Sequence, residues 1–265
     1  MSRQAREPVK YRERAGQAAC LYSPRAAARS GHRRLWRRCT RSPTGVPRPM
    51  TVERATTVLV VRHGRTALNA QGRFRGLADP PLDEIGLAEV DETARSIAAR
   101  PKTGQPETGQ PESERPIAAI ATSPLARARQ TAESIGVVTG REPFVMRELL
   151  DLDHGAWEGL TADEARARDP LEYERFRDDP RASRPPGGEP LGEVEHRMRT
   201  ALASLAARYP GEEVVAVSHE IPIRLLLSGL RDVDGRAVWA FDLSTASITP
   251  VTRERDGTWA VFRSI

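Results

Sequence analysis

Cysteine is nearly absent from this sequence of 265 residues: only Cys20 and Cys39 occur, and both lie within the first 50 residues. The rest of the chain therefore cannot build a disulfide framework or a thiolate metal site. Long hydrophobic runs are missing as well, because no apolar stretch approaches the ~18 residues that a membrane-spanning helix requires. This composition is typical of a protein of the reducing cytoplasm, and we expect it there, without a membrane partner.

The basic charge does not extend along the whole chain. The sequence has 41 Lys and Arg against 36 Asp and Glu, but residues 1–50 hold 13 of the basic and 2 of the acidic residues, a local charge of +11. The other residues carry 28 basic and 34 acidic side chains, a charge of −6. Because this larger part is mildly acidic, we expect no nucleic-acid partner. Whether the chain forms a homodimer stays open.

The first 50 residues differ in character from the rest. They are rich in Arg, Ala and Pro and show no sustained hydrophobic period. We interpret residues 1–50 as a basic, disordered leader, or as residues upstream of a true start at Met50, since MTVERATTVLVVRHG passes from a short polar stretch into an apolar strand. Residues 51–265 are expected to form one domain. Within it, residues 101–116 contain TGQPE twice, which predicts a flexible surface loop.

Apolar segments of β-strand type alternate with helical periodicity from residue 56 onward. Buried strands are expected over 57–61, 117–122 and 212–218, and terminal strands over 238–243, 247–251 and 259–262. A helix expected over 83–100 spaces its apolar side chains three or four residues apart, at Leu87, Val90, Ala94 and Ile97. The alternation indicates an α/β protein with three layers, α/β/α, around a mostly parallel central sheet.

Three of the expected strands end in polar clusters, namely Arg62-His63-Gly64, Ser123-Pro124 and Ser218-His219-Glu220. In an open α/β sheet the ligand binds outside the carboxyl ends of the strands, so we expect these clusters to converge. An imidazole such as that of His63 is a competent nucleophile near neutral pH. Arg62 offers a planar donor fork that matches phosphate oxygens, and Asn69 and Arg73 are close enough in sequence to reach the same pocket. The clusters predict phosphate chemistry.

The stretch VVRHGRTALNAQGRFRGLADPPLDEIG resembles the opening segment of the histidine phosphatase superfamily, which includes the cofactor-dependent phosphoglycerate mutases. Further segments that resemble this family follow in order: ATSPLARARQTAE, LLDLDHGAWEGL, PPGGEPLGEVEHRM and VVAVSHEIPIRLLL. The resemblance covers about residues 56–265. It implies the phosphoglycerate mutase-like fold, a small phosphate ester as the ligand, and no requirement for a metal ion or other cofactor.

The same resemblance implies a mechanism. His63 would attack phosphorus and become a phosphohistidine, while Arg62, Arg127 and His219 would hold the non-bridging oxygens of the phosphoryl group. Mutases of the family typically have a Trp after the nucleophile segment and a longer insertion near the proton donor, and this chain has neither. We therefore expect a phosphomonoester hydrolase that acts on a small phosphorylated metabolite, with mutase-type phosphoryl transfer as the alternative.

The chain departs from the family pattern at the proton donor. The family usually has Glu four residues before the first Gly of Gly-x-Trp-Glu-Gly, and counting back from Gly155 leads to Asp151. Asp is one methylene shorter than Glu and can transfer the same proton, so Asp151 is the expected general acid. Glu148 remains the alternative. His154 is expected at the rim of the pocket.

Two further departures concern charge. Arg75 stands where the family commonly has Gln, and Glu220 stands where Gly is common. An additional cation at the pocket favours substrates that carry a second anionic group, whereas a carboxylate there repels them. The sequence leaves open whether Arg75 faces the pocket or the solvent.

Overall fold

A seven-stranded sheet organises the computed structural model, which describes residues 9–11, 55–100 and 117–264. Most of the expected leader and the loop expected over 101–116 lie outside the described residues. The strand order is β1-β7-β6-β2-β5-β3-β4. The strands are β1 (Val9–Tyr11), β2 (Thr56–Arg62), β3 (Ala119–Thr122), β4 (Pro143–Val145), β5 (Glu213–Ser218), β6 (Ile248–Arg253) and β7 (Trp259–Val261).

The sheet is mixed: the strands of one half pair parallel, and those of the other half pair antiparallel. β2, β5, β3 and β4 run parallel, whereas β6 pairs antiparallel with both β2 and β7. The expected α/β architecture is confirmed, with the parallel half in the strands that end in polar clusters. β1 also pairs antiparallel with β7, so Val9–Tyr11 is an exception to the leader expected over residues 1–50. The backbone of an edge strand offers unpaired groups to such a segment.

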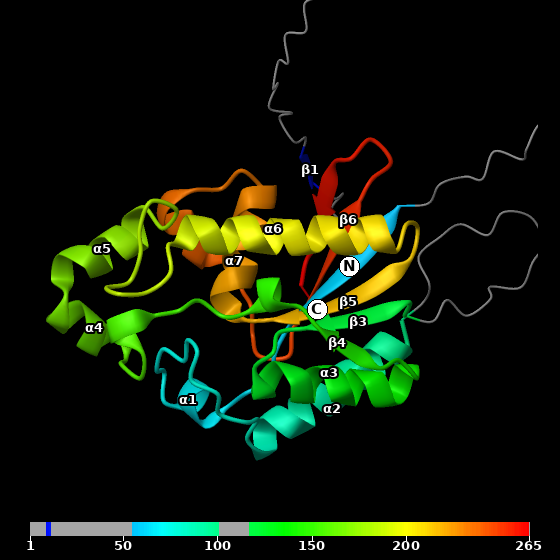
Figure 1. Ribbon diagram of the computed structural model, residues 1–265, viewed down its shortest axis with the longest axis horizontal. Helices are drawn as coiled ribbons and strands as arrows, with labels where there is room; N and C mark the ends of the chain where they lie inside the picture. Colours follow the sequence, from blue (N-terminus) through cyan, green and yellow to red (C-terminus); the bar gives the residue numbers. More distant parts are fainter. Residues whose placement is uncertain (1–8, 12–54, 101–116, 265) are drawn as a thin grey trace, which may run out of the picture. The chain divides into compact units, whose positions relative to one another are not determined.

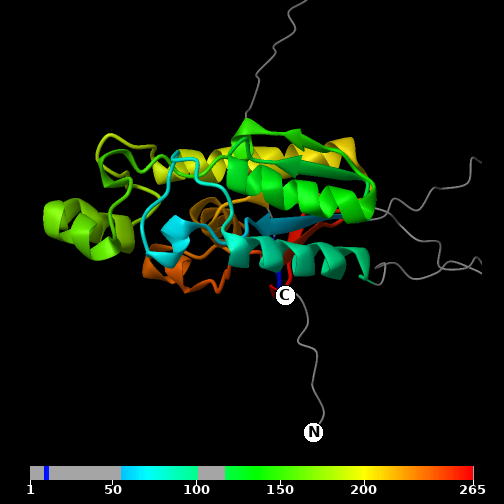
Figure 2. The ribbon, with the colours of Figure 1, turned by 90° about the horizontal axis from the view of Figure 1, so that it is seen from below.

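Helices cover both faces of the sheet (Figures 1 and 2). The α-helices are α1 (Ala67–Ala70), α2 (Glu84–Ala98), α3 (Ala126–Thr139), α4 (Ala162–Arg168), α5 (Pro170–Asp178), α6 (Leu191–Arg208) and α7 (Glu220–Leu230). Three 3-10 helices are η1 (Arg147–Leu149), η2 (Gly155–Trp157) and η3 (Gly235–Ala240). α6 and α7 lie on one face, while α2 and α3 lie on the other (Figure 1).

Alternation along β2 divides the core between these faces. Val58 and Val60 pack in the cluster formed with α6 and α7, whereas Leu59 and Val61 pack in the cluster formed with α2 and α3. All four side chains are buried. Side chains of successive strand residues point to opposite faces, so a strand covered on both sides has to be apolar throughout. The apolar run of this strand in the sequence reflects that double coverage.

The segment 238–243, which we expected to be a strand, is not one: its first part belongs to η3, and the prediction is wrong. Val238 is buried, and the ring of Trp239 stacks on Phe176 with centroids 4.8 Å apart. The indole N–H of Trp239 donates to the carbonyl of Arg177 at 3.0 Å. Packing against α5 therefore overrides the apolar alternation that suggested a strand.

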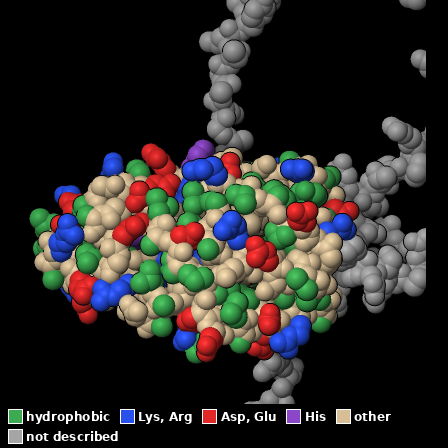
Figure 3. Space-filling view, turned by 60° about the horizontal axis from the view of Figure 1, so that its bottom comes forward, with side chains coloured by type: hydrophobic (Ala, Val, Ile, Leu, Met, Phe, Trp, Pro, Cys, Tyr) green, Lys and Arg blue, Asp and Glu red, His purple; other side chains and the backbone are tan. Residues whose placement is uncertain are grey.

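The charged side chains on one face of the molecule are of both signs. Arg side chains are interspersed there with Asp and Glu, and no field of a single sign covers that face (Figure 3). In the part of the chain that the structure describes, no helix is both long and apolar enough to span a bilayer.

Candidate active site

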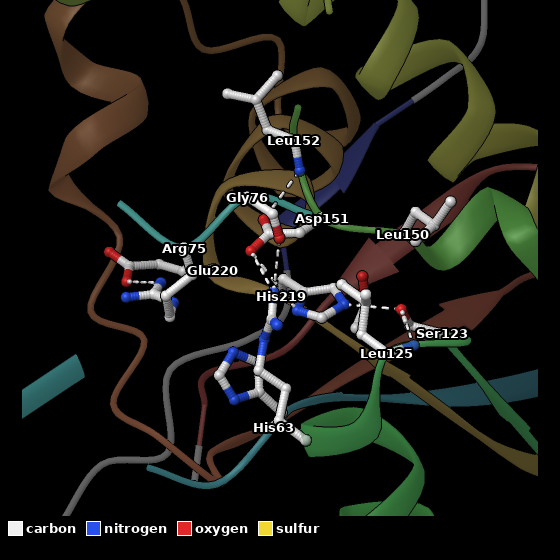
Figure 4. A network of polar contacts seen from close by, with 12 residues as sticks. His63, Arg75, Gly76, Ser123, Leu125, Leu150, Asp151, Leu152, His219 and Glu220 are labelled. Carbon is white, nitrogen blue, oxygen red and sulfur yellow. Dashed lines mark hydrogen bonds and ion pairs between the residues drawn. The ribbon is translucent and has the colours of Figure 1, made fainter. Parts of the chain in front are cut away.

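Three parallel strand ends meet at one edge of the sheet. The backbone N–H of His63, directly after β2, donates to the carbonyl of Ser218 at 3.0 Å, and that of Ser123, after β3, donates to Val217 at 3.0 Å. His219 follows β5 directly and precedes α7. The expected convergence of the polar clusters is therefore present in the structure (Figure 4). A fourth segment, which carries Asp151, reaches the same place after η1.

The orientation of the His63 ring is set by its own backbone. Nδ1 lies 2.7 Å from the carbonyl oxygen of Gly64, and because a carbonyl only accepts, Nδ1 carries the proton. The lone pair is then on Nε2, which is buried and has no hydrogen-bond partner among the described residues. Burial lowers the pKa of His63 well below its usual 6.5, and the charges of His219 and Arg127 lower it further. The ring is therefore neutral, as a nucleophile has to be.

Gly64 is required by the packing behind His63. A Cβ at this position would lie 2.6 Å from Cγ1 of Val90 and 2.7 Å from the carbonyl oxygen of Gly86. The backbone N–H of Gly64 also donates to the hydroxyl of Thr131 at 3.1 Å. These contacts with α2 and α3 hold the carbonyl that orients the His63 ring.

His219 lies next to His63, with ring centroids 5.0 Å apart, and it is fully buried. Its Nε2 is 2.8 Å from the hydroxyl of Ser123, and its Nδ1 is 3.7 Å from Oδ2 of Asp151. Burial, followed by the charges of Arg127 and Arg75, lowers its pKa well below 6.5. His219 can therefore offer one ring nitrogen to a bound oxyanion while Ser123 holds the other.

Asp151 and Arg127 form a buried ion pair. Nη2 of Arg127 lies 3.0 Å from Oδ2 of Asp151 and donates also to the carbonyl of Gly76 at 2.9 Å, while Nη1 donates to the carbonyl of Ala78 at 2.7 Å. Burial raises the pKa of Asp151, but the charges of Arg127 and Arg75 outweigh it and hold that pKa below its usual value. Asp151 is thus ionised when no anion is bound.

Arg62 is held from two sides. Its Nη1 donates to the carbonyl of Leu243, and its Nη2 lies 2.7 Å from Oε2 of Glu220. Burial lowers the pKa of Arg62 to about 10, against the opposing effect of Glu220. A pKa of about 10 still leaves the guanidinium charged at neutral pH. Oε1 of Glu220 also accepts from Arg224, at 3.2 Å from its Nε and 3.1 Å from its Nη2.

Two of the predicted phosphate ligands have other contacts. The side-chain oxygen of Asn69 accepts from the N–H and the hydroxyl of Thr66, at 3.1 and 2.9 Å, and so caps α1; its role toward phosphate stays a prediction. Arg73 is placed away from the pocket, because its Nη1 donates to the carbonyl of Gly159 at 2.7 Å and to Glu164 at 2.8 Å. This corrects the expectation for Arg73, whose side chain fastens its segment to α4.

Arg75, which the sequence left open, lies at the site. Its side chain is 12% exposed, and its Nη2 is 3.7 Å from the same Glu220 oxygen that contacts Arg62. Arg73 and Arg75 are only two residues apart, and nothing in the local sequence predicts that the guanidinium of Arg75 turns toward the site while that of Arg73 turns away from it. Only the path of the backbone separates them.

Arg197 was missed by the sequence reasoning. It donates to the carbonyls of Glu148, Leu150 and Asp151 at 2.7, 2.7 and 3.0 Å, and it forms a two-point ion pair with Glu189 at 2.9 and 3.0 Å. One side chain therefore fixes the backbone that presents Asp151. Because Arg197 and Glu189 both fall inside PPGGEPLGEVEHRM, the motif could have drawn attention to them, but not to the carbonyls that they bind.

The remaining candidates take different positions. Glu148 and Asp151 both line a hollow of about 430 Å³ beside the site, but it is Asp151 that contacts Arg127 and faces His219. His154 is buried, stacks on Phe74 with centroids 4.7 Å apart, and has a pKa lowered to about 4 by burial. No group of three His, Cys, Asp or Glu at metal-ligand spacing occurs among the described residues.

Comparison with known proteins gives one consistent result. A family model of the histidine phosphatase superfamily (branch 1) matches residues 58–104 and 107–264. The bifunctional protein Rv2228c of Mycobacterium tuberculosis is 34% identical over 206 residues, which are 78% of this chain and 52% of that protein. The chain thus spans about half the length of the first curated relatives that it matches.

Two further similar proteins match over most of their own length. Phosphoserine phosphatase 1 of Hydrogenobacter thermophilus is 28% identical over 197 residues, 74% of this chain and 86% of that protein. The structure of a mycobacterial glucosyl-3-phosphoglycerate phosphatase, Rv2419c, superposes with a TM-score of 0.65 at 27% identity, over 77% of this chain and 96% of the other. With its motifs, its site geometry and the family match in agreement, this chain belongs to the histidine phosphatase superfamily.

Proposed function

We propose that the protein hydrolyses phosphate monoesters through a phosphohistidine at His63. One observation carries this proposal: Nδ1 of His63 is held by the Gly64 carbonyl, so that a neutral, buried Nε2 keeps its lone pair without a hydrogen-bond partner among the described residues. The charges of His219, Arg127 and Arg62 act on this ring and lower its pKa. Two guanidiniums and an imidazole provide donors for the oxygens of a phosphoryl group. Such a preorganised set of donors stabilises the charge of the transition state without further rearrangement.

In the first step, Nε2 of His63 attacks phosphorus and the bond between phosphorus and the ester oxygen breaks. The leaving oxygen needs a proton. We assign its donation to Asp151, whose Oδ2 lies 3.0 Å from Nη2 of Arg127 and 3.7 Å from Nδ1 of His219. The two negative charges of a bound phosphate oppose the effect of Arg127 and Arg75, so binding raises the pKa of Asp151 and favours its protonated form. The general acid is therefore generated by the substrate itself.

In the second step, water attacks the phosphorus of the phosphohistidine. Asp151, ionised by the first step, accepts a proton from this water, and the bond between Nε2 and phosphorus breaks. His63 is released as a neutral ring, because Nδ1 keeps its proton on the Gly64 carbonyl. Asp151 is then protonated again, and it returns to its ionised form when inorganic phosphate leaves.

The substrate in this proposal is a small phosphorylated metabolite. The names of the similar proteins, a phosphoserine phosphatase and a glucosyl-3-phosphoglycerate phosphatase, support hydrolysis as the reaction class. The mechanism uses side chains alone, so we propose that turnover needs neither a metal ion nor another cofactor. We propose a cytoplasmic location for this activity.

Trapping of the phosphoenzyme tests the proposal. Rapid quenching with a phosphorus-labelled ester should place label on the parent protein in an acid-labile form, and His63→Ala should abolish both label and turnover. His196→Ala, which changes an exposed histidine on α6, is the matched control and should keep both. Turnover should be unaffected by chelators.

Two outcomes would contradict the proposal. Label that persists in His63→Ala would assign the nucleophile elsewhere. Formation of 2-phosphoglycerate from 3-phosphoglycerate and a bisphosphoglycerate primer, without release of inorganic phosphate, would establish the mutase alternative instead.

A further inference from the structure

Arg75 is a cation to which the proposed chemistry assigns no ligand. Its guanidinium is largely removed from water, at 12% exposure, yet its contacts are weak. Nη1 donates to the carbonyl of Arg73 at 3.4 Å, Nη2 lies 3.7 Å from Glu220, and the buried Nε has no hydrogen-bond partner among the described residues. Burying a charge costs free energy unless partners compensate it, so this guanidinium is short of an anion.

Glu220 does not supply that anion in full. Its Oε2 lies 2.7 Å from Arg62, and its Oε1 receives two contacts from Arg224, at 3.2 and 3.1 Å. The contact with Arg75, at 3.7 Å, is the longest of the set. One carboxylate is thus shared among three guanidiniums, and Arg75 keeps donors available for a ligand.

The segment that carries Arg75 runs between the two arginines assigned to phosphate. On one side Arg75 shares the Glu220 oxygen with Arg62, and on the other the carbonyl of Gly76 accepts from Arg127 at 2.9 Å. Figure 4 shows Arg75 beside Glu220. In agreement with this position, the charge of Arg75 lowers the pKa of His63, His219 and Asp151 alike. Arg75 therefore borders the phosphate pocket.

The backbone around Arg75 is fixed by contacts from distant parts of the chain. Phe74 pairs with Leu160 and Gly159, with N···O distances of 2.8 and 2.9 Å, and the N–H of Leu77 donates to Glu158 at 2.6 Å. Gly76 has φ 52°, and a Cβ there would lie 2.1 Å from the same Glu158 carboxylate. A side chain on so constrained a segment is placed before the ligand arrives, which reduces the entropic cost of binding.

We propose that Arg75 forms a second anion subsite beside the phosphate pocket. It would select phosphate monoesters that carry another anionic group, a carboxylate or a second phosphate, on the ester side. The proposal rests on the phosphatase function proposed for the same site, but it concerns binding and does not require turnover.

Ligand binding to the His63→Ala protein tests the subsite. Calorimetry would compare 3-phosphoglycerate with glycerol 3-phosphate, which differ in a carboxylate against a hydroxymethyl group. The His63→Ala protein should bind 3-phosphoglycerate more tightly than glycerol 3-phosphate. Adding Arg75→Gln should reduce the ratio of the Kd of glycerol 3-phosphate to the Kd of 3-phosphoglycerate by about tenfold or more, as expected for loss of a hydrogen bond to a charged group. Arg75→Lys, which keeps the charge but not the fork, should retain part of the preference.

Arg73→Gln is the matched control, since Arg73 lies two residues away but binds Gly159 and Glu164; it should leave the ratio unchanged. A short alkanediol bisphosphate, in place of the carboxylate ester, distinguishes a second phosphate from a carboxylate as the preferred group. An unchanged ratio in folded Arg75→Gln, no preference in the parent, or no binding of either ester would overturn the subsite. A failure of phosphoenzyme trapping would overturn the phosphatase function. The ratio of the two Kd values could still be measured, so the two proposals can fail separately.

Discussion

At the residue scale, the reactivity of the site depends on which atom each polar group uses for its structural contact. His63 uses Nδ1 for the Gly64 carbonyl and keeps Nε2, and His219 uses Nε2 for Ser123 and keeps Nδ1. Asp151 uses Oδ1 to accept from the N–H of Leu152 at 2.9 Å and shares Oδ2 between Arg127 and His219. Each ring thus keeps one nitrogen without a hydrogen-bond partner among the described residues, and Asp151 keeps Oδ2 for its ion pair.

The proton donor provides the first residue-scale prediction. Asp151→Asn cannot protonate the leaving oxygen, so kcat/KM on an alkyl phosphate should fall by about 10²- to 10⁴-fold. On p-nitrophenyl phosphate, whose leaving group needs no proton, the loss should be much smaller. Steady-state assays with both esters measure the ratio.

Glu148→Gln is the comparison, because Glu148 lines the neighbouring hollow and was the alternative donor. It should leave the ratio between the two esters unchanged. If Glu148→Gln produced the selective loss and Asp151→Asn did not, the roles of these two residues would be reversed.

At the element scale, the segment between β4 and η2 has little regular structure of its own and depends on a neighbouring helix. η1 is a single 3-10 turn, and the residues after it have no strand partner. α6 supplies Arg197, which gathers three carbonyls of this segment, while Glu189 fixes the guanidinium. α6 thus fixes the position of Asp151, the proposed general acid.

We expect Arg197→Met, which keeps most of the apolar stem, to lower the free energy of unfolding by about 2–4 kcal/mol, since it leaves Glu189 and three carbonyls without their donor. It should also reduce kcat more than KM, because Asp151 loses its position while the phosphate ligands remain. Urea unfolding and steady-state kinetics measure the two effects.

Arg175→Met is the control for removal of an arginine from a helix. The pair of Arg175 with Glu172 is exposed, with a distance of 3.0 Å, and such pairs contribute about 0–1 kcal/mol. A loss of stability in Arg197→Met no greater than in Arg175→Met would contradict the role of Arg197.

At the scale of the whole molecule, the site imposes a dependence of stability on pH. The pKa values of His63, His154 and His219 are all lowered by burial in the folded state. Below about pH 6.5 the unfolded chain binds protons that the folded protein does not. The contribution of these three histidines to the free energy of unfolding is therefore largest above about pH 6.5 and decreases as the pH falls below it.

The free energy of unfolding should decrease on acidification from pH 7 to pH 5, by up to about 1.4 kcal/mol per pH unit for each of the three histidines. His154→Gln should reduce this slope by up to the share of one histidine, because burial lowers the pKa of His154 to about 4. Urea titrations at several pH values provide the measurement. A slope that His154→Gln leaves intact would contradict burial of the neutral ring.

Much of the architecture was determined by the sequence alone. β2 is apolar throughout because both of its faces are buried, and α2 shows a helical period because one side of it is buried. Both patterns can be read from the local sequence, as can the polar residues that follow three of the strands. His63 and His219 could be placed together for the same reason: parallel strands end at one edge of a sheet. The segment 238–243 was misjudged because its apolar residues serve contacts with α5 that have no local period.

The tertiary structure decided which charges meet. Arg73 and Arg75 are two residues apart and identical in type, yet one binds α4 and the other borders the pocket. The difference comes from pairing of Phe74 with Leu160 and Gly159, some 85 residues along the chain, which sets the direction of each side chain. The hold of Arg197 on the Asp151 segment has the same origin. Such long-range contacts depend on the folded path of the backbone, and no local pattern in the sequence records them.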